Sequence, residues 1–181
     1  MADLPQTFSM VGFSLGGLWA LELLRRAPQR IERLALIASN AQAGSKAGRR
    51  RSDWLGKLWK ARGPVEVAKH VKPAYFHHES KRRRFQNLVL DMAMQTSKSA
   101  AMAEFAWAAH RPDGFDALTS FGGKLLVVSG EHDKLCPRSM QAAMVQAQPK
   151  AEWHALPRCG HFLPLEAPAK LSALLLNWIK P

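Results

Sequence analysis

The apolar positions of this chain gather in short runs near both ends of the sequence. Four such runs are found, at residues 7–12, 32–39, 124–130 and 151–157. The first contains β-branched and aromatic residues and ends in Gly, and the second is a continuous apolar run without alternation of apolar and polar positions. Such a continuous run is typical of a strand in a parallel sheet that is covered on both faces. We therefore expect four strands, of which the first three are buried.

Stretches with apolar residues at helical spacing follow three of these runs. They cover residues 15–27, 139–148 and 167–179. The first ends before Pro28, which cannot continue a helix, and the last places Leu171, Leu174, Leu175 and Trp178 on one face. Because strands alternate with helices, the pattern predicts an α/β fold with a parallel sheet and right-handed crossovers.

The middle of the chain has no clear strand pattern. Helical patterns occur there at residues 51–62, 64–71, 82–95 and 98–110. We interpret residues 41–116 as a helical cap inserted into an α/β core that is formed by residues 1–40 and 117–181.

Composition adds an uneven positive charge to this picture. The chain has a formal net charge of +12, and residues 41–110 hold 14 Lys and Arg against 5 Asp and Glu. Clusters such as Arg49–Arg51 and Lys81–Arg84 carry much of this charge. They are either a solvated helix face or a landing surface for an acidic partner or an anionic substrate.

Aromatic residues lie among these basic positions, namely Trp54, Trp59, Tyr75 and Phe76. Nucleic-acid surfaces combine such residues, but amphipathic packing explains them equally well. Since no nucleic-acid motif accompanies them, nucleic-acid binding is not expected.

Membrane and secretory classes are disfavoured. No apolar stretch is long enough to span a bilayer, and the start lacks the pattern of a signal peptide. Cys136 and Cys159 do not make a disulfide framework, so we expect a cytoplasmic protein with two free thiols.

A serine between two glycines stands where the first predicted strand meets the first predicted helix. Residues Gly12 to Gly16, "GFSLG", fit the pattern G-x-S-x-G. On a sharp strand-to-helix turn, side chains two positions either side of Ser14 are expected to collide with backbone, which explains Gly12 and Gly16. The turn strains Ser14 and lifts its Oγ out of the fold, as a nucleophile requires. The alternative is a core serine in a glycine-rich turn.

A nucleophilic serine needs a base and an orienting carboxylate, and two later loops offer them. Asp133 follows the predicted strand 124–130, and His161 follows the predicted strand 151–157. The carboxyl ends of parallel strands meet at one edge of the sheet, where α/β proteins place their active sites. A structural role for His161 remains an alternative. Other candidates for the acid are Glu131, His132, Asp113 and Asp116.

No metal or organic cofactor is predicted. His77, His78 and Glu79 are adjacent ligand types without further spacing, which favours a solvated turn.

Three segments carry a resemblance to a known family. "VGFSLGG", "LLVVSGEHDKLCP" and "CGHFLPLEAP" resemble the nucleophile elbow, the acid loop and the histidine loop of small bacterial α/β-hydrolases. This group includes carboxylesterases, lactonases, C–C bond hydrolases and pimeloyl carrier-protein methyl ester esterases. The resemblance runs from about Leu4 to the C-terminus, and the cap matches least; "AHRPDGFDAL" resembles the segment that returns from the cap.

The resemblance implies roles for individual residues. Ser14 is the nucleophile, Asp133 the orienting acid and His161 the general base, and the Leu15 backbone N–H is one oxyanion-hole donor. A serine at the elbow argues against haloalkane dehalogenases and epoxide hydrolases, which place Asp there.

The family also has about four more strands before the elbow, together with a loop that carries a second oxyanion-hole donor. Three explanations are open. The first, which we favour, is that the chain is a fragment of a longer protein. In the second, another chain supplies the missing edge, through a homodimer at the exposed first strand or through strand exchange. In the third, the protein is a reduced or inactive hydrolase.

The expected function is therefore that of a serine hydrolase, which acts on a small-molecule ester or acyl substrate through an acyl-enzyme. Lactones and C–C bond substrates use the same triad. The alternative is a non-catalytic module whose basic cap binds an acidic partner, such as a carrier protein.

Overall fold

The computed structural model describes residues 5–71 and 74–180. It contains a four-stranded sheet in which all neighbouring strands are parallel, with the order β1-β2-β3-β4. The strands are β1 (Phe8–Phe13), β2 (Ile31–Ile37), β3 (Lys124–Gly130) and β4 (Glu152–Leu156). The predicted α/β fold with a parallel sheet of about four strands is confirmed.

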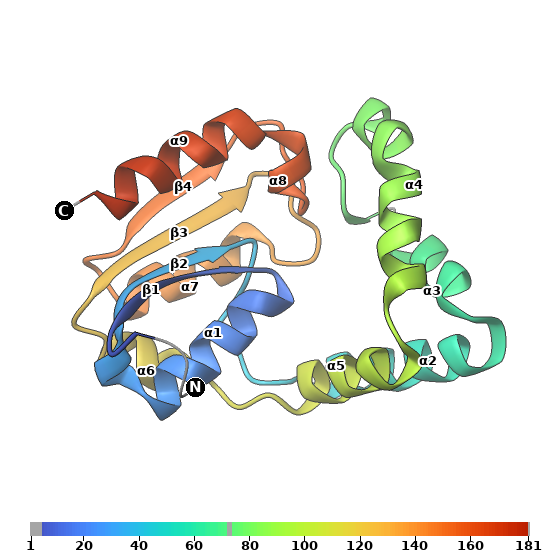
Figure 1. Ribbon diagram of the computed structural model, residues 1–181, viewed down its shortest axis with the longest axis horizontal. Helices are drawn as coiled ribbons and strands as arrows, with labels where there is room; N and C mark the ends of the chain where they lie inside the picture. Colours follow the sequence, from blue (N-terminus) through green and yellow to red (C-terminus); the bar gives the residue numbers. More distant parts are fainter. Residues whose placement is uncertain (1–4, 72–73, 181) are drawn as a thin grey trace.

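Helices cover both faces of the sheet (Figure 1). On one face lie α1 (Leu15–Arg26), α6 (Phe115–Thr119) and α7 (Arg138–Ala147), and on the other lie α8 (Leu163–Glu166) and α9 (Pro168–Ile179). A short 3-10 helix, η1 (Pro28–Arg30), leads into β2.

The strand β2 shows why its sequence is apolar throughout. Its residues Leu34 and Leu36 join one buried cluster, with Leu21 of α1 and Met144 of α7. The intervening Ala35 and Ile37 join a second cluster that includes Leu171 and Trp178 of α9. Since both faces are buried, both sets of side chains must be apolar.

Four helices follow β2 and form the second lobe in Figure 1. They are α2 (Lys46–Arg62), α3 (Pro64–Val71), α4 (Glu79–Gln95) and α5 (Lys98–His110). Their small apolar cluster is centred on Leu55, Trp59, Val67 and Ala101. These helices lie within the predicted cap. The division into a core and a cap stays a prediction, and its outer limits, residues 1 and 181, lie outside the described residues.

The helix bounds differ from the sequence pattern at a few ends. The helix α2 begins at Lys46 rather than at residue 51, because the Ser45 side chain caps it by accepting a hydrogen bond of 3.0 Å from the Gly48 N–H. The helix α4 begins at Glu79 rather than at residue 82. The short helices α6 and α8 were not predicted.

The strand β1 lies at one end of the sheet and pairs only with β2 among the described residues. Its Val11 side chain is 49% exposed. The expected bare edge is therefore present in the described part of the chain. Within the same residues, no helix combines the length and the apolar character that crossing a bilayer requires.

Candidate active site

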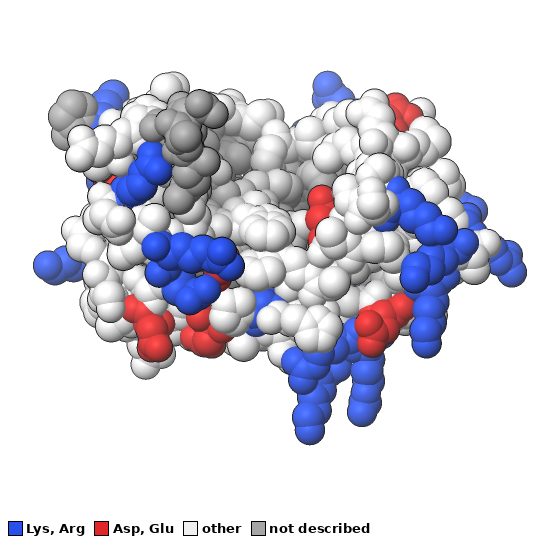
Figure 2. Space-filling model, turned by 60° about the horizontal axis from the view of Figure 1, so that its bottom comes forward, with Lys and Arg blue, Asp and Glu red and all other residues white. Residues whose placement is uncertain are grey.

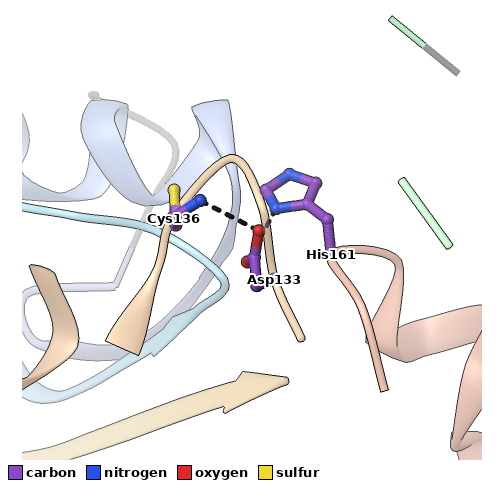
Figure 3. A group of neighbouring side chains, drawn as sticks. All are labelled: Asp133, Cys136 and His161. Carbon is purple, nitrogen blue, oxygen red and sulfur yellow. Dashed lines mark hydrogen bonds and ion pairs between the residues drawn. The ribbon is translucent and has the colours of Figure 1, made fainter. Parts of the chain in front are cut away.

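Three side chains from separate loops meet at the carboxyl edge of the sheet. His161 Nε2 lies 2.8 Å from Ser14 Oγ, and His161 Nδ1 lies 2.9 Å from Asp133 Oδ2. Ser14 stands between β1 and α1, Asp133 follows β3, and His161 follows β4. Figure 3 shows the Asp133 carboxylate beside the His161 ring. The structure thus brings together the three residues that the sequence predicts, in the geometry of a nucleophile, a base and an orienting acid.

Ser14 has the strained backbone expected of a nucleophile elbow. Its φ is 52° and its ψ is −116°, a backbone conformation that residues other than glycine rarely adopt. Two hydrogen bonds secure this turn to β2 and the residues after it. The Ser14 N–H donates to the Ile37 carbonyl at 2.8 Å, and the Ser39 hydroxyl donates to the Ser14 carbonyl at 3.0 Å. These contacts hold the strained residue in place.

The glycines of the elbow differ from the expectation at one position. A Cβ on Gly12 would lie 2.6 Å from the Gly17 Cα, so the steric reason predicted for Gly12 is correct. At Gly16, no described atom outside its chain neighbours and its own helix backbone lies within 4 Å of such a Cβ, so the steric reason predicted for this glycine is wrong. The second tight position is Gly17, where a Cβ would lie 2.4 Å from Ser39 Oγ. Gly16 sits on the exposed side of α1, whereas Gly17 faces Ser39.

Asp133 is held by backbone as well as by His161. Its Oδ1 accepts hydrogen bonds from the N–H groups of Leu135 at 2.8 Å and of Cys136 at 2.9 Å, while Oδ2 faces His161. Figure 3 shows the Cys136 nitrogen directed at this carboxylate. The side chain is buried, so the carboxylate has a single orientation.

The other candidates for the acid have different surroundings. Glu131 and His132 are exposed. Asp113 accepts a hydrogen bond from the Phe115 N–H, and Asp116 belongs to α6. In the described structure, the carboxylate that faces His161 is that of Asp133.

Leu15 is the first residue of α1, directly after Ser14. The first N–H groups of a helix have no acceptor within the helix and point outward. This position suits the predicted role of the Leu15 N–H as a donor to an oxyanion, and that role stays a prediction.

A cavity of about 340 Å³ opens at Ser14. Its walls come from the β1–α1 turn, from the helices α2 to α5 and from Phe162, so the predicted cap covers the serine. Trp59 and Tyr75 line this cavity and Phe76 is buried. These three aromatic residues therefore pack inside the molecule, in keeping with the amphipathic explanation of their positions, whereas Trp54 is 47% exposed and does not fit that explanation.

Aromatic rings surround the histidine. The ring centroids of Phe13 and Tyr75 lie 5.5 Å and 6.0 Å from that of His161, and Phe162 packs on both rings at 5.4 Å and 4.8 Å. Burial raises the pKa of the Tyr75 hydroxyl, which therefore stays protonated. These apolar neighbours keep water away from the His161 ring and strengthen its hydrogen bonds.

Among the residues that the structure describes, the lining of the cavity is nearly free of charge, although the cap is strongly basic. This described lining has no Lys or Arg, and its one ionisable acid is Glu104 of α5. Figure 2 shows Lys and Arg side chains projecting outward from the lobes, while the hollow between the lobes is mostly white. The described Lys and Arg side chains of the cap therefore lie outside this lining.

Asp133, Cys136 and His161 are the one group of potential metal ligands that lie within 4.8 Å of one another in the described residues. Their atoms have other partners. Both ring nitrogens of His161 are hydrogen-bonded, and burial raises the pKa of the Cys136 thiol to about 12. A cysteine that binds a metal must be a thiolate, and a raised pKa keeps Cys136 protonated. The three residues therefore fit acid–base chemistry better than metal binding. Both cysteines are free and buried.

Sequence reasoning missed several residues around the site, among them Phe13, Phe162 and Glu166. Glu166 accepts hydrogen bonds from the backbone of Gly160 and His77. The segment "CGHFLPLE" contains both Phe162 and Glu166, but no periodic pattern in it indicates their contacts with the cap.

Comparisons with known proteins agree with this geometry. Residues 2–174 match the model of the alpha/beta hydrolase family. The chain is 25% identical to 2-hydroxymuconate semialdehyde hydrolase of Pseudomonas putida, over 96% of this chain and 63% of that protein.

Two solved structures show the same fold. A thermophilic esterase from Thermogutta terrifontis matches with a TM-score of 0.86 and 24% identity, over 96% of this chain and 65% of that one. The enol-lactonase from Burkholderia xenovorans LB400 matches with a TM-score of 0.83 and 22% identity, over 96% and 66%. The chain thus spans somewhat less than two thirds of the length of these proteins. Its sequence match and its fold together show that the chain belongs to the alpha/beta hydrolase family.

Proposed function

We propose that this protein is a serine hydrolase that cleaves carboxylic esters with neutral, apolar acyl groups. The observation that carries the proposal is the chain of hydrogen bonds from Ser14 Oγ to His161 and on to Asp133, at 2.8 Å and 2.9 Å. Ordered this way, the imidazole can accept the serine proton while the carboxylate stabilises the imidazolium that forms.

The reaction has two halves. In the first, His161 Nε2 takes the proton from Ser14, and Oγ attacks the ester carbonyl carbon. The Leu15 N–H donates to the oxygen that becomes negative. The tetrahedral intermediate then collapses, and the alcohol leaves with the proton that His161 returns. In the second half, His161 activates a water molecule, which attacks the acyl-enzyme and releases the carboxylic acid.

The cavity favours a neutral acyl group over an anionic one. Its lining is apolar apart from Ser14, Thr96, Glu104 and the Tyr75 hydroxyl. A substrate carboxylate that enters it meets no Lys or Arg among the described lining residues and faces Glu104, so it loses hydration without gaining a partner there. This supports a solvated helix face as the explanation of the basic cap, rather than a landing surface for an anionic substrate. Lactones and C–C bond substrates that carry no such charge use the same triad.

Esters of p-nitrophenol test this proposal. The purified protein should hydrolyse the butyrate and hexanoate esters with an initial burst. The value of kcat/KM for the anionic hemiglutarate should be at least about 10-fold lower than for the hexanoate. A tenfold ratio corresponds to a difference of only about 1.4 kcal/mol in the free energy of the bound transition states. Ser14→Ala should show only background hydrolysis. Ser139→Ala, at an exposed position on α7, is the matched control and should retain wild-type rates.

Two results would count against the proposal. If the folded protein hydrolyses no ester, or if Ser14→Ala is as active as the wild type, the chemistry is wrong. If the hemiglutarate is cleaved as well as the hexanoate, the choice of acyl group is wrong.

A further inference from the structure

The loop that carries His161 is bonded to the cap through consecutive backbone groups. The N–H groups of His161 and Phe162 both donate to the Tyr75 carbonyl, each at 2.9 Å. The preceding N–H, that of Gly160, donates to Glu166 Oε2 at 2.6 Å. This loop has no regular secondary structure between the end of β4 and the start of α8. Its position therefore depends on these contacts.

The Glu166 carboxylate joins the loop to the cap. While Oε2 accepts from Gly160, the other oxygen, Oε1, accepts from the His77 N–H at 2.7 Å. Glu166 is the last residue of α8, and His77 precedes α4, 89 positions earlier in the chain. One side chain thus satisfies a backbone donor on each side of the contact. Hydrogen bonds to an ionised acceptor are the stronger kind.

The two backbones approach each other closely at this point. A Cβ on Gly160 would lie 2.7 Å from the His77 nitrogen and 3.0 Å from the Tyr75 oxygen. The His77 ring also stacks on that of His132, with centroids 3.8 Å apart and an interplanar angle of 8°. His132 is the residue before Asp133, so the same cap segment touches both the histidine loop and the acid loop.

We propose that Glu166 is a positioning residue, which holds the His161 loop against the cap and so keeps the imidazole in line between Ser14 and Asp133. The proposal rests on the proposed function, in which His161 is the general base. Catalytic groups must be held within about 0.5 Å of the productive geometry, and a misplacement of about 1 Å can lower the rate by about 10²-fold. By this mechanism, the cap takes part in placing the base as well as in covering the substrate.

A purely structural role for Glu166 predicts a different outcome. In that case, its loss lowers the stability and the fraction of folded protein, but each correctly folded molecule reacts at the normal rate. Titration of active sites, followed by calculation of kcat per titrated site, separates the two roles.

Two substitutions and one control make the test. Glu166→Ala removes both acceptor oxygens, and Glu166→Gln keeps one and replaces the other by a donor. Glu131→Gln removes the same charge from an exposed side chain at the same edge of the sheet. We expect kcat per titrated site to fall by about 10- to 100-fold in Glu166→Ala and by less in Glu166→Gln, with KM changed by less than about threefold. The control should stay within about twofold of the wild type.

Amide hydrogen exchange gives a readout that does not need catalysis. Peptides that cover residues 75–78 and 158–163 should exchange faster in both Glu166 variants than in the wild type and the Glu131→Gln control. If Glu166→Ala does not fold, Glu166→Gln decides the question by both measurements.

The proposal is overturned if both variants keep wild-type kcat per titrated site, or if exchange at these peptides does not change. A wild-type protein without esterase activity contradicts the proposed function instead. Faster exchange in the variants would then show that Glu166 joins the loop to the cap, but not that it acts in ester hydrolysis.

Discussion

Replacing the glycines around Ser14 by alanine, one at a time, should give two different results, although each change adds the same methyl group. At Gly12, the new Cβ would lie 2.6 Å from the Gly17 Cα, whereas ordinary contact begins at 3.4 Å. Both atoms belong to the backbone region of the turn, so β1 and α1 must separate by at least 0.8 Å, the difference between these distances. Ser14 and Leu15 move with them.

The expected cost follows from that displacement. Overpacking of this kind lowers the free energy of unfolding by about 1–3 kcal/mol. A shift approaching 1 Å in the nucleophile and its oxyanion donor should lower kcat by about 10²-fold. Gly12→Ala should therefore lose far more activity than its loss of stability explains.

The other two glycines differ from each other. In Gly17→Ala, the Cβ would lie 2.4 Å from Ser39 Oγ and 2.5 Å from Ser39 Cβ, so turning the Ser39 hydroxyl does not relieve the contact and the backbones of α1 and residue 39 must separate. We therefore expect a loss of the same order as in Gly12→Ala, which includes about 1 kcal/mol for the hydrogen bond from Ser39 to the Ser14 carbonyl. Gly16→Ala meets no described atom within 4 Å outside its chain neighbours and its own helix backbone, and alanine favours a helix over glycine by up to about 1 kcal/mol. It should be neutral or stabilising.

The assay combines urea unfolding, followed by circular dichroism, with kcat per titrated site on p-nitrophenyl butyrate. We predict that Gly16→Ala has the kcat of the wild type, and that Gly12→Ala and Gly17→Ala both have a far lower kcat. If Gly16→Ala loses as much activity as Gly12→Ala, or if Gly12→Ala retains full activity, the steric account of the elbow is refuted.

Three further predictions concern charged groups. Asp133→Asn should lower kcat by about 10³- to 10⁴-fold in steady-state assays, because an amide cannot hold the His161 tautomer that accepts the serine proton. A hydrogen bond from Arg25 lowers the pKa of the Glu22 carboxyl to about 2 from 4.5. The contribution of the Glu22 carboxylate to stability is therefore present above pH 4.5 and is lost as the pH falls toward 2. Over this range, the urea midpoint of Glu22→Gln should fall less than that of the wild type. If the basic face of the cap binds an acidic carrier protein, titration calorimetry should show binding that weakens steeply with salt and is reduced by the double change Arg83→Glu and Arg84→Glu.

Each of these predictions has a contrary result. Full activity of Asp133→Asn would remove the orienting acid from the mechanism. Parallel pH profiles for Glu22→Gln and the wild type would show that the ion pair of Glu22 with Arg25 does not govern acid stability. Binding of an acidic protein that ignores both salt and the arginine changes would place the contact elsewhere on the molecule.

The sequence predicted the sheet and most helices because their patterns are local. Short runs rich in apolar residues marked all four strands, and helices such as α3 and α5 matched the expected bounds. The triad was predictable for the same reason, since the ends of parallel strands share one edge of the sheet. The short helices α6 and α8, of five and four residues, are too short for any periodicity to show.

The contacts between the cap and the core could not be predicted in this way. Glu166 and His77 are 89 positions apart, and no local pattern pairs them. The difference between Gly16 and Gly17 also depends on tertiary structure, because only the placement of α1 against Ser39 makes the second position tight. Likewise, the net charge of the cap did not reveal that its described Lys and Arg side chains lie outside the cavity lining.

The central claim is that Ser14 is a nucleophile activated by His161. A fluorophosphonate probe forms a covalent bond with an activated serine, and mass spectrometry of the digested protein locates the adduct. We predict one adduct, on Ser14, that forms in the wild type and is absent from Ser14→Ala and His161→Ala. A folded wild-type protein that forms no adduct at Ser14, or a His161→Ala variant that labels as fast as the wild type, would contradict the claim.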